Sequence, residues 1–553
     1  MSENLAKLSQ RKGLENNLFE NIIKTEGDPV RLKALAEDYK IGDANVYGAA
    51  TAYDFIQGEN ANKKAYVCNG SSCLCAGTQK NVKNKLLEKL AEEDIGHVCC
   101  LGRCHENASF QISGINYSGS DIEQLEEILN QTHDSGEHYP VECLMDKPLL
   151  TETIADFPSY YALFTRLTQT SSPAEILQTI IDSGLRGRGG AGFPTGIKWK
   201  ACADEVSNEK YIVCNADEGD PGAYTDRYLM EQRPHAVLFG MLMAGYLAGA
   251  SWGVLYIRDE YPQSVEQIQQ AINEFQSLNL LKDLDFNFQF KIVRGAGAYI
   301  CGEETALLRS LEGQKPMVSV RPPFPTVKGL FGQPTILNNV ESFAAIHWIL
   351  ENSAEAFSTL GNGRSTGSKL LSLDSSFNNP GIYEVAMGEK LSHVIEQAGG
   401  FSKPVKALHI GGPLGGLVPA EKFAELTIDF ESFDEQGFLL GHASIIGIPE
   451  QQNIAEYIHH LFDFTAAESC GKCFPCRLGA TRGKEMFRDA ISGEHKLDKV
   501  LLDDLLETME KGSLCALGGG VPLPVKNALQ YFLPEIESLF EPSSLNKIDV
   551  VEV

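Results

Sequence analysis

The grouping of the cysteines is the feature that most constrains this chain. Most of its 14 cysteines fall in three short stretches, at residues 68–75, 99–104 and 470–515, while Cys143, Cys202, Cys214 and Cys301 stand alone. Disulfides are disfavoured in a reducing compartment, so grouped cysteines there indicate metal or redox chemistry. The isolated cysteines are expected to be small buried apolar residues.

The third cysteine group has the spacing of a metal site. The stretch "ESCGKCFPCR" (468–477) places Cys470, Cys473 and Cys476 as C-x2-C-x2-C, and Cys515 follows in "GSLCALGGG". Four thiolates suit either a 4Fe–4S cluster or tetrahedral zinc. Zinc sites more often use two separated C-x2-C pairs, so this spacing favours iron–sulfur. The alternative is a non-catalytic scaffold with structural zinc, which would be colourless and free of flavin.

Length and charge narrow the class of protein. A chain of 553 residues predicts about three to five domains. The net charge of −27, from 74 acidic and 47 basic residues, argues against nucleic-acid binding, which needs a basic surface. No apolar run reaches about 18 residues, so direct membrane insertion is not expected. The polar amino-terminal stretch has no signal-peptide core, and we expect a cytoplasmic protein.

Hydrophobic patterns predict an α/β multidomain protein. Residues 1–55 have helical spacing, and residues 56–134 read as a compact α/β unit in which each of two strands ends in a cysteine loop. Strand and helix patterns alternate over 150–355, as in α/β layer folds. Residues 360–448 predict short strands with Gly/Pro turns and one helix at 391–399. Residues 450–545 predict a helical bundle that carries the third cysteine group.

A glycine-rich loop is the first candidate ligand site. In "GLRGRGGAGFPTGIKW" (184–199), closely spaced glycines let backbone amides approach a phosphate. Arg186, Arg188 and Lys198 add positive charge, and Phe193 and Trp199 are candidates to flank a planar ring. The loop does not have the G-x-G-x-x-G pattern, and the alternative is a flexible surface loop.

Three further segments carry carboxylates, amides and an aromatic residue. "CNADEGDPGAYTDR" (214–227) follows a predicted strand, where its carboxylates can accept hydrogen bonds from ribose hydroxyls; the alternative is an acidic turn. In "GAGAYICGEETALLRSLEG" (295–313), Glu303 and Glu304 open a predicted helix, where the alternative role is capping. "RPPFPTVKGLFGQPTILNNVES" (321–342) supplies Phe324, Asn338 and Asn339.

Together and in this order, these motifs resemble the NADH-binding flavoprotein subunit of respiratory complex I. The same module occurs in NAD-reducing hydrogenases and NAD-dependent formate dehydrogenases, and the match covers residues 150–545. The resemblance implies an α/β domain for FMN and NAD(H), a β-grasp (SLBB-like) domain and a helical bundle with a 4Fe–4S cluster. Residues 56–134 resemble the thioredoxin-like 2Fe–2S domain of complex I's small partner subunit, here fused to the flavoprotein.

The resemblance also implies roles for individual residues. Phe193 and Phe324 correspond to aromatics that stack on the nicotinamide and adenine rings, and Asn338 and Asn339 to ligands of the FMN phosphate end. Glu218 and Asp220 are expected to repel a 2′-phosphate and so favour NAD over NADP. No acid–base residue is assigned. The other residues placed at the flavin and dinucleotide are Gly187, Arg188, Gly189, Lys198, Asn215, Asp217, Gly302, Glu303 and Glu304.

Two cluster ligand sets follow from the same resemblance. Cys470, Cys473, Cys476 and Cys515 are expected to hold the 4Fe–4S cluster. The 2Fe–2S ligands are expected to be Cys68, Cys73, Cys100 and Cys104, spaced C-x4-C and C-x3-C. Cys75 and Cys99 are alternative ligands, and a thioredoxin-like domain without a cluster is the alternative for the whole unit.

The function implied is that of a diaphorase subunit in an NAD-linked complex. It would transfer hydride between NAD(H) and FMN, and pass single electrons through its clusters to or from a catalytic large subunit with further iron–sulfur clusters. The fused amino-terminal unit argues against an ordinary complex I subunit, and the short carboxyl end against an electron-bifurcating hydrogenase. The preferred partner is a molybdenum or tungsten formate dehydrogenase subunit; the alternative is a bidirectional NAD-reducing hydrogenase.

Overall fold

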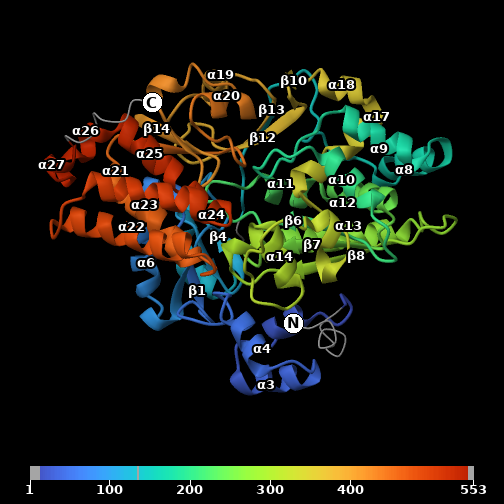
Figure 1. The fold of residues 1–553 in the computed structure, drawn as a ribbon, viewed down its shortest axis with the longest axis horizontal. Coiled ribbons are helices and arrows are strands. Elements are labelled where there is room, and N and C mark those ends of the chain that lie inside the picture. The colour runs from blue at the N-terminus through green and yellow to red at the C-terminus, as the bar shows by residue number, and fades with distance from the viewer. Residues whose placement is uncertain (1–12, 134–135, 546–553) are drawn as a thin grey trace.

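The centre of the molecule is a parallel four-stranded sheet. The computed structural model describes residues 13–133 and 136–545, and Figure 1 shows how their helices and strands are arranged. The strand order β8-β7-β6-β9 places β9 beside β6, on the side opposite β7. Ligands of open α/β sheets bind at such a switch point, outside the carboxyl ends of the strands. The strands are β6 (Tyr211–Ala216), β7 (Trp252–Ile257), β8 (Gln289–Arg294) and β9 (Thr335–Asn339).

Helices cover both faces of this sheet, as a parallel sheet requires. One face packs on α12 (Pro234–Ala248) and α13 (Pro262–Ser277). The other face packs on α14 (Glu304–Leu311) and on the amino-terminal helices, with Leu18 and Phe19 in the same core as Val213 and Val254. The predicted helical segment is therefore part of the central core. Its helices are α2 (Leu18–Ile23), α3 (Pro29–Asp38) and α4 (Asp43–Ala50).

Residues 65–129 form the predicted compact α/β unit. Its sheet has the order β2-β1-β3-β4, in which β1 pairs parallel with β2 and antiparallel with β3. The hairpin of β3 and β4 follows Cys104 and was not foreseen, because each strand has only three residues. The elements are β1 (Ala65–Cys68), α5 (Ser71–Ala76), α6 (Gln79–Leu87), β2 (Ile95–Val98), β3 (Phe110–Ile112), β4 (Ile115–Tyr117) and α7 (Leu125–Leu129).

The β-rich unit is a six-stranded sheet with an unexpected edge. Its order is β15-β14-β16-β12-β13-β5, and β5 comes from the connector, where Val141 lies opposite Ile382. The helix predicted at 391–399 is α19 (Leu391–Gln397), and a second short helix, α20 (Phe430–Glu435), accompanies it. The strands are β5 (Val141–Cys143), β12 (Ser368–Leu373), β13 (Ile382–Ala386), β14 (Val405–Ile410), β15 (Gly416–Pro419) and β16 (Ser444–Pro449).

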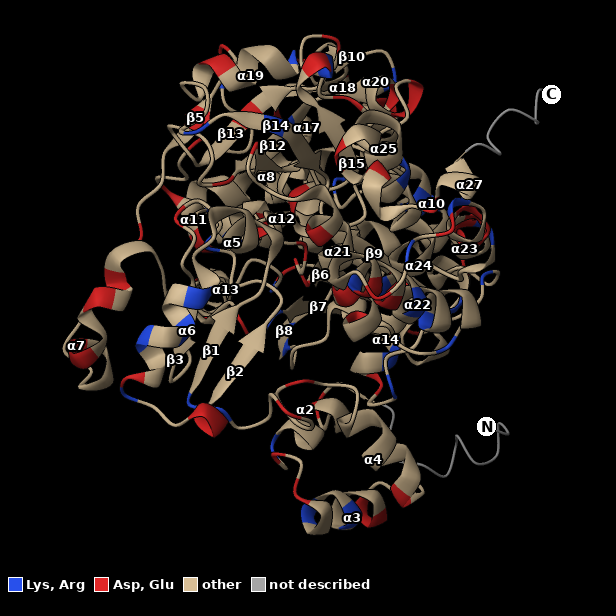
Figure 2. Cartoon of the chain, turned by 90° about the vertical axis from the view of Figure 1, so that its left-hand side faces the viewer, with Lys and Arg blue, Asp and Glu red and all other residues tan. Residues whose placement is uncertain are grey.

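The carboxyl-terminal unit is helical, as predicted. Together with the sheets of the other units, it confirms the predicted α/β multidomain class. Helices α21 and α22 pack closely because Gly483 has no side chain: a Cβ there would lie 2.4 Å from Cε1 of Phe462. Figure 2 shows basic and acidic residues together on α22. The main helices are α21 (Ile454–Glu468), α22 (Phe474–Ser492), α23 (Lys499–Gly512), α24 (Ala516–Gly520) and α25 (Pro522–Tyr531).

The structure bears on two expectations: that the isolated cysteines are buried, and that no segment crosses a membrane. Cys202, Cys214 and Cys301 are buried as expected, whereas Cys143 on β5 is only partly buried. Within residues 13–133 and 136–545, none of the helices combines the length and the apolar character needed to cross a bilayer.

Candidate cofactor-binding site

A cavity of about 560 Å³ opens at the carboxyl ends of β6 and β9. It therefore lies at the switch point of the central sheet. Most of the residues expected at the cofactors line it: Gly187, Gly189, Phe193, Lys198, Asn215, Asp217, Glu218, Asp220, Gly302, Glu303, Glu304, Asn338 and Asn339. The structure thus brings together four sequence segments that are far apart in the chain.

The glycine-rich loop forms one wall. The loop is closed by a hydrogen bond from the Gly187 amide to the Phe193 carbonyl, 2.8 Å long. Gly190 and Gly192 have φ values of +116° and +61°, which side chains rarely adopt. At Gly189 a Cβ would lie 3.0 Å from Cβ of Asn339, so glycine permits the loop to lie against the end of β9.

Lys198 is the cation that the loop region brings to the cavity. Its Nζ donates to the Leu337 carbonyl over 2.9 Å, and burial lowers its pKa. Next to it, the Trp199 indole is buried and donates to Oδ1 of Asn338 at 3.0 Å. Trp199 is therefore a support for Asn338 and not a ring that flanks a ligand.

Arg186 and Arg188 direct their side chains away from the cavity. The Arg186 guanidinium donates to the Gly192 carbonyl at 2.7 Å and pairs with Glu431 at 2.6 Å. The Arg188 guanidinium is buried, donates to the Thr366 carbonyl at 2.5 Å and lies 4.0 Å from Glu341. Neither side chain lines the cavity, contrary to expectation, because the Gly192 and Thr366 carbonyls and the Glu431 carboxylate hold both elsewhere.

The two glutamates that open α14 have different partners. The Glu303 carboxylate caps the helix, accepting from the amides of Thr305 and Ala306, both at 2.9 Å. Glu304 forms an ion pair with Arg321. Both carboxylates still line the cavity. Glu303 therefore has the alternative role of capping the helix. Glu304 is held by the guanidinium of Arg321.

Of the two aromatic residues expected to stack on the dinucleotide, Phe193 lies at the cavity and Phe324 does not. Phe193 lines the cavity and is 52% exposed, so its ring is free to contact a ligand. Phe324 is also exposed, but it precedes α15 (Pro325–Lys328) and does not line the cavity.

Asn215 and Asp220 connect the end of β6 and the loop after it to the segment before α14, and Asp217 lies between them. The Asn215 amide donates to the Gly302 carbonyl at 2.8 Å. The Tyr299 hydroxyl donates to the Asp220 carboxylate at 2.6 Å. Burial raises the pKa of Asp217, whose Oδ2 has no hydrogen-bond partner.

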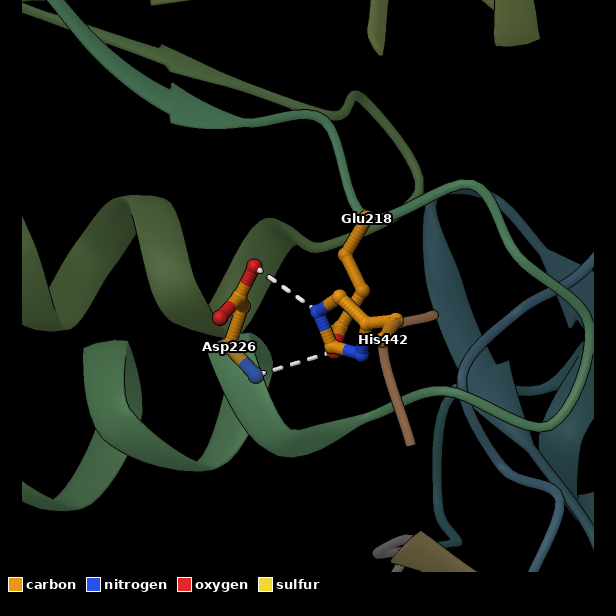
Figure 3. Close-up of side chains that lie close together, drawn as sticks. All are labelled: Glu218, Asp226 and His442. Atoms are coloured by element: carbon orange, nitrogen blue, oxygen red, sulfur yellow. Dashed lines mark hydrogen bonds and ion pairs between the residues drawn. The ribbon is translucent and has the colours of Figure 1, made fainter. Parts of the chain in front are cut away.

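A buried triad, Glu218, Asp226 and His442, closes the cavity on the side of the β-rich unit (Figure 3). Glu218 accepts from the amides of Asp226 and Arg227, at 2.9 and 3.0 Å, at the start of α11 (Thr225–Gln232). Nε2 of His442 lies 3.4 Å from Asp226 and 3.6 Å from Glu218.

The protonation of this triad follows from its charges. Burial lowers the pKa of His442, but Asp226 and Glu218 raise it more, to about 9. Burial and Asp226 raise the pKa of Glu218 to about 7. We interpret His442 as an imidazolium between two carboxylates. Sequence reasoning missed it, because an isolated histidine in "LGHAS" has no motif, and only folding brings it to Asp226.

The first two cysteine groups meet beside the loop 217–222, which follows β6. Cys68, Cys73, Cys100 and Cys104 are buried, and Sγ of Cys100 lies 3.6 Å from Sγ of Cys104. Two thiolates on one tetrahedral metal ion, with bonds of about 2.3 Å, have nearly this separation. The Cys99 thiol instead donates to the Gly219 carbonyl at 3.7 Å, and Cys75 packs against the core of the helical unit. The geometry therefore fits the four expected 2Fe–2S ligands.

The sulfurs of the third cysteine group are spaced more widely than the ligands of a single metal ion. Cys470, Cys473, Cys476 and Cys515 pack together with Phe464 and Leu517. In the described part of the chain, no three of these four sulfurs all lie within 4.8 Å of one another. Four sulfurs on one zinc ion would lie about 3.8 Å apart. The donor set therefore fits a multi-iron cluster better than zinc.

Three family models match the chain. The Nuo51 FMN-binding domain matches residues 180–348, the NADH-ubiquinone oxidoreductase-F iron-sulfur binding region matches 456–539, and the thioredoxin-like [2Fe-2S] ferredoxin matches 28–133.

Known proteins are similar to large parts of this chain. NADP-reducing hydrogenase subunit HndC of Solidesulfovibrio fructosivorans is 40% identical over 398 residues, covering 70% of this chain and 80% of that protein. A subunit of the NADH-quinone oxidoreductase of Escherichia coli is 37% identical over 377 residues, covering 66% and 84%. A chain of a solved NAD+-reducing [NiFe]-hydrogenase in the H2-reduced state aligns with a TM-score of 0.85 at 29% identity, covering 95% of this chain and 92% of that one.

Proposed function

Because the chain belongs to the family that includes these NADH-quinone oxidoreductase and hydrogenase subunits, we propose that its cavity and cysteine sets form one electron route. The protein is an NAD-dependent oxidoreductase with FMN, a 4Fe–4S cluster and a 2Fe–2S cluster as cofactors. Its function is that of a diaphorase subunit, which exchanges electrons between NAD(H) and a partner. Bound FMN supplies the conversion between two-electron hydride chemistry and one-electron transfer.

One observation carries this proposal: one cysteine set contributes to the cavity lining, and the other contacts a loop that lines it. Cys515 lines it together with Ala516 and Leu517. Residues 217–220 of the loop 217–222 also contribute to the lining, and the Gly222 amide of this loop donates to Sγ of Cys104. A flavin in this cavity would therefore be adjacent to a 4Fe–4S ligand and separated from the 2Fe–2S ligands by one loop.

The residues of the cavity have separate roles in the proposal. The amides of the glycine-rich loop and Nζ of Lys198 hold the FMN phosphate end, supported by Asn338 and Asn339. The exposed ring of Phe193 stacks on the dinucleotide. Ile300, Leu337 and Leu517 supply apolar walls that exclude water. These groups orient two rings, and none has to act as an acid or a base.

An exposed apolar surface beside the 4Fe–4S ligands supports docking of the partner subunit there. Phe474 and Leu478 lie one turn apart on α22 and are 66% and 59% exposed, directly after Cys473. Leu514, next to Cys515, is also exposed. Large exposed apolar side chains at a redox site are typical of an interaction surface.

The partner is proposed to be the catalytic subunit of a molybdenum or tungsten formate dehydrogenase. This choice rests on the sequence resemblance, in which a thioredoxin-like 2Fe–2S unit is fused to the flavoprotein part. A second candidate is a hydrogenase subunit. It is favoured by the alignment with the NAD+-reducing [NiFe]-hydrogenase chain, which covers 95% of this protein and hence most of the fused amino-terminal unit.

The test is purification of the protein with its natural partner. We expect bound FMN, iron in both clusters, and reduction of NAD+ by formate. Reduction of NAD+ by H2 and not by formate would select the hydrogenase, and protein with zinc and no flavin would overturn the diaphorase function.

The docking surface has its own test. Leu478→Asp should abolish co-purification of the partner while NADH still reduces the bound flavin. Val206→Asp is the matched control, because Val206 is fully exposed, at 101%, and belongs to neither cysteine set. Retention of the partner by Leu478→Asp would place the docking surface elsewhere.

A further inference from the structure

Arg258 joins the loop 217–222 to the first cysteine sites. It follows β7 directly and is only 2% exposed. Its Nη1 donates to the Glu218 carbonyl at 2.7 Å, and its Nη2 donates to the Cys100 carbonyl at 2.8 Å. One guanidinium thus contacts the backbone of a cavity residue and of an expected 2Fe–2S ligand.

The position of Arg258 is fixed by further contacts. Nη2 also pairs with Oε1 of Glu260 at 2.7 Å and lies 3.7 Å from Sγ of Cys99. The guanidinium lies 5.0 Å from the centre of the Tyr261 ring. That ring packs on Gly102, where a Cβ would lie 2.7 Å from Cε1 of Tyr261. The charge is therefore held at one place beside the cysteine loop.

The surroundings of Arg258 are strongly acidic. It lines a small cavity with Asp54, Asp217, Glu260 and Glu468, and it is the one Lys, Arg or His among the described residues of that lining. An arginine side chain stays charged in proteins, and the Glu260 carboxylate pairs with this guanidinium. Without it, this lining would hold four carboxylates, of which Glu260 is buried, with no cation among them.

We propose that Arg258 is a positioning residue that sets the reduction potential of the 2Fe–2S site. A fixed positive charge beside Cys100 stabilises the extra negative charge that one-electron reduction places on the cluster, and so raises the potential. Glu260, paired with the same guanidinium, partly offsets this charge. The inference rests on the proposed ligation by Cys68, Cys73, Cys100 and Cys104.

Two substitutions with opposite expected effects test the proposal. Arg258→Gln removes the charge and should make reduction of the 2Fe–2S cluster about ten-fold less favourable, a shift of about 59 mV to lower potential. Glu260→Gln leaves the charge of Arg258 uncompensated and should shift the potential upward. The matched control is Arg294→Gln, because Arg294 pairs with Asp259 at the end of the adjacent strand and is half exposed.

The measurement is a dithionite titration of the full chain with redox mediators, followed by the electron paramagnetic resonance of each cluster. The 4Fe–4S signal serves as an internal reference. Opposite shifts in the two variants, with a smaller shift in Arg294→Gln, support the proposal.

Four results would overturn it. These are wild-type potentials in both variants, loss of the cluster from Arg258→Gln with no shift in Glu260→Gln, an equal shift in Arg294→Gln, or equal shifts of both clusters. A wild-type protein with FMN and a 4Fe–4S signal but no 2Fe–2S signal would instead refute the ligand assignment, and leave the diaphorase function standing.

Discussion

The backbone amide of Gly222 donates a hydrogen bond to Sγ of Cys104 over 3.3 Å. Gly222 ends the loop whose first residues, Asp217 to Asp220, line the flavin cavity. The same short segment therefore borders the cavity and contacts an expected ligand of the 2Fe–2S cluster. Hydrogen bonds to ligand sulfurs help to set the reduction potential of such clusters, so we expect this contact to influence the potential of the 2Fe–2S cluster.

Replacing Gly222 by Ala should disturb this junction. Gly222 has φ +97°, and a Cβ there would lie 2.8 Å from Cγ1 of Ile446. We expect a loss of about 1–3 kcal/mol in unfolding free energy and lower 2Fe–2S content. Thermal unfolding and iron analysis measure both. Gly249→Ala is the control, because Gly249 has φ +71° but open space around it; equal iron loss in both variants would contradict the prediction.

Replacing Cys473 by Ala should separate the two halves of the reaction. The expected 4Fe–4S ligand is lost, while the cavity lining, which does not include Cys473, stays intact. NADH should still bleach the flavin at near wild-type rate, but electron transfer to the partner should fall by at least about 100-fold. Stopped-flow absorbance and partner-coupled turnover are the two readouts. Undiminished coupled turnover would exclude this group as the outlet for electrons.

Glu218 and Asp220 should differ in their effect on nucleotide choice. The Glu218 carboxylate accepts from two amides of α11, whereas Asp220 accepts from the Tyr299 hydroxyl and lines the cavity. We expect Asp220→Asn to raise the kcat/KM ratio of NADPH to NADH about ten-fold, equivalent to about 1.4 kcal/mol. Glu218→Gln should lose stability by about 1–3 kcal/mol and gain no NADPH activity. Steady-state kinetics with NADH and NADPH measure this ratio for each variant. A gain of NADPH activity in Glu218→Gln would assign the discrimination between the two nucleotides to Glu218.

The stability of the protein should fall between about pH 6.5 and 9 because of His442. Its folded pKa, about 9, is above the ordinary value of 6.5. The folded state thus binds more protons in this interval, and stability present below pH 6.5 is lost as the pH rises through 9. Thermal unfolding of His442→Gln should show its largest deficit near pH 6.5 and a smaller one above pH 9. The exposed His495→Gln is the control, and a deficit independent of pH would refute a charged His442.

Sequence patterns predicted the features of this structure that depend on residues close together in the chain. The Cys470–Cys476 spacing and the strand ahead of Asn215 fix which residues can share a site. They do not fix where a long side chain points, which is why Arg188 turned toward Glu341 and Trp199 toward Asn338. His442 and Arg258 acquire their partners from segments far away in sequence, and such pairings depend on the tertiary fold.

The pairing of Val141 with Ile382 has a consequence for how this protein can be divided. Strand β5 lies in the connector after the amino-terminal unit, yet it completes the edge of a sheet built more than 200 positions later. Cutting the chain behind β5, to separate the amino-terminal unit from the rest, would strip that sheet of its outer strand and leave the backbone of β13 open to pairing with other molecules. A cut ahead of β5 keeps the sheet whole, so a two-chain version of this protein has one workable boundary, and it lies before Val141.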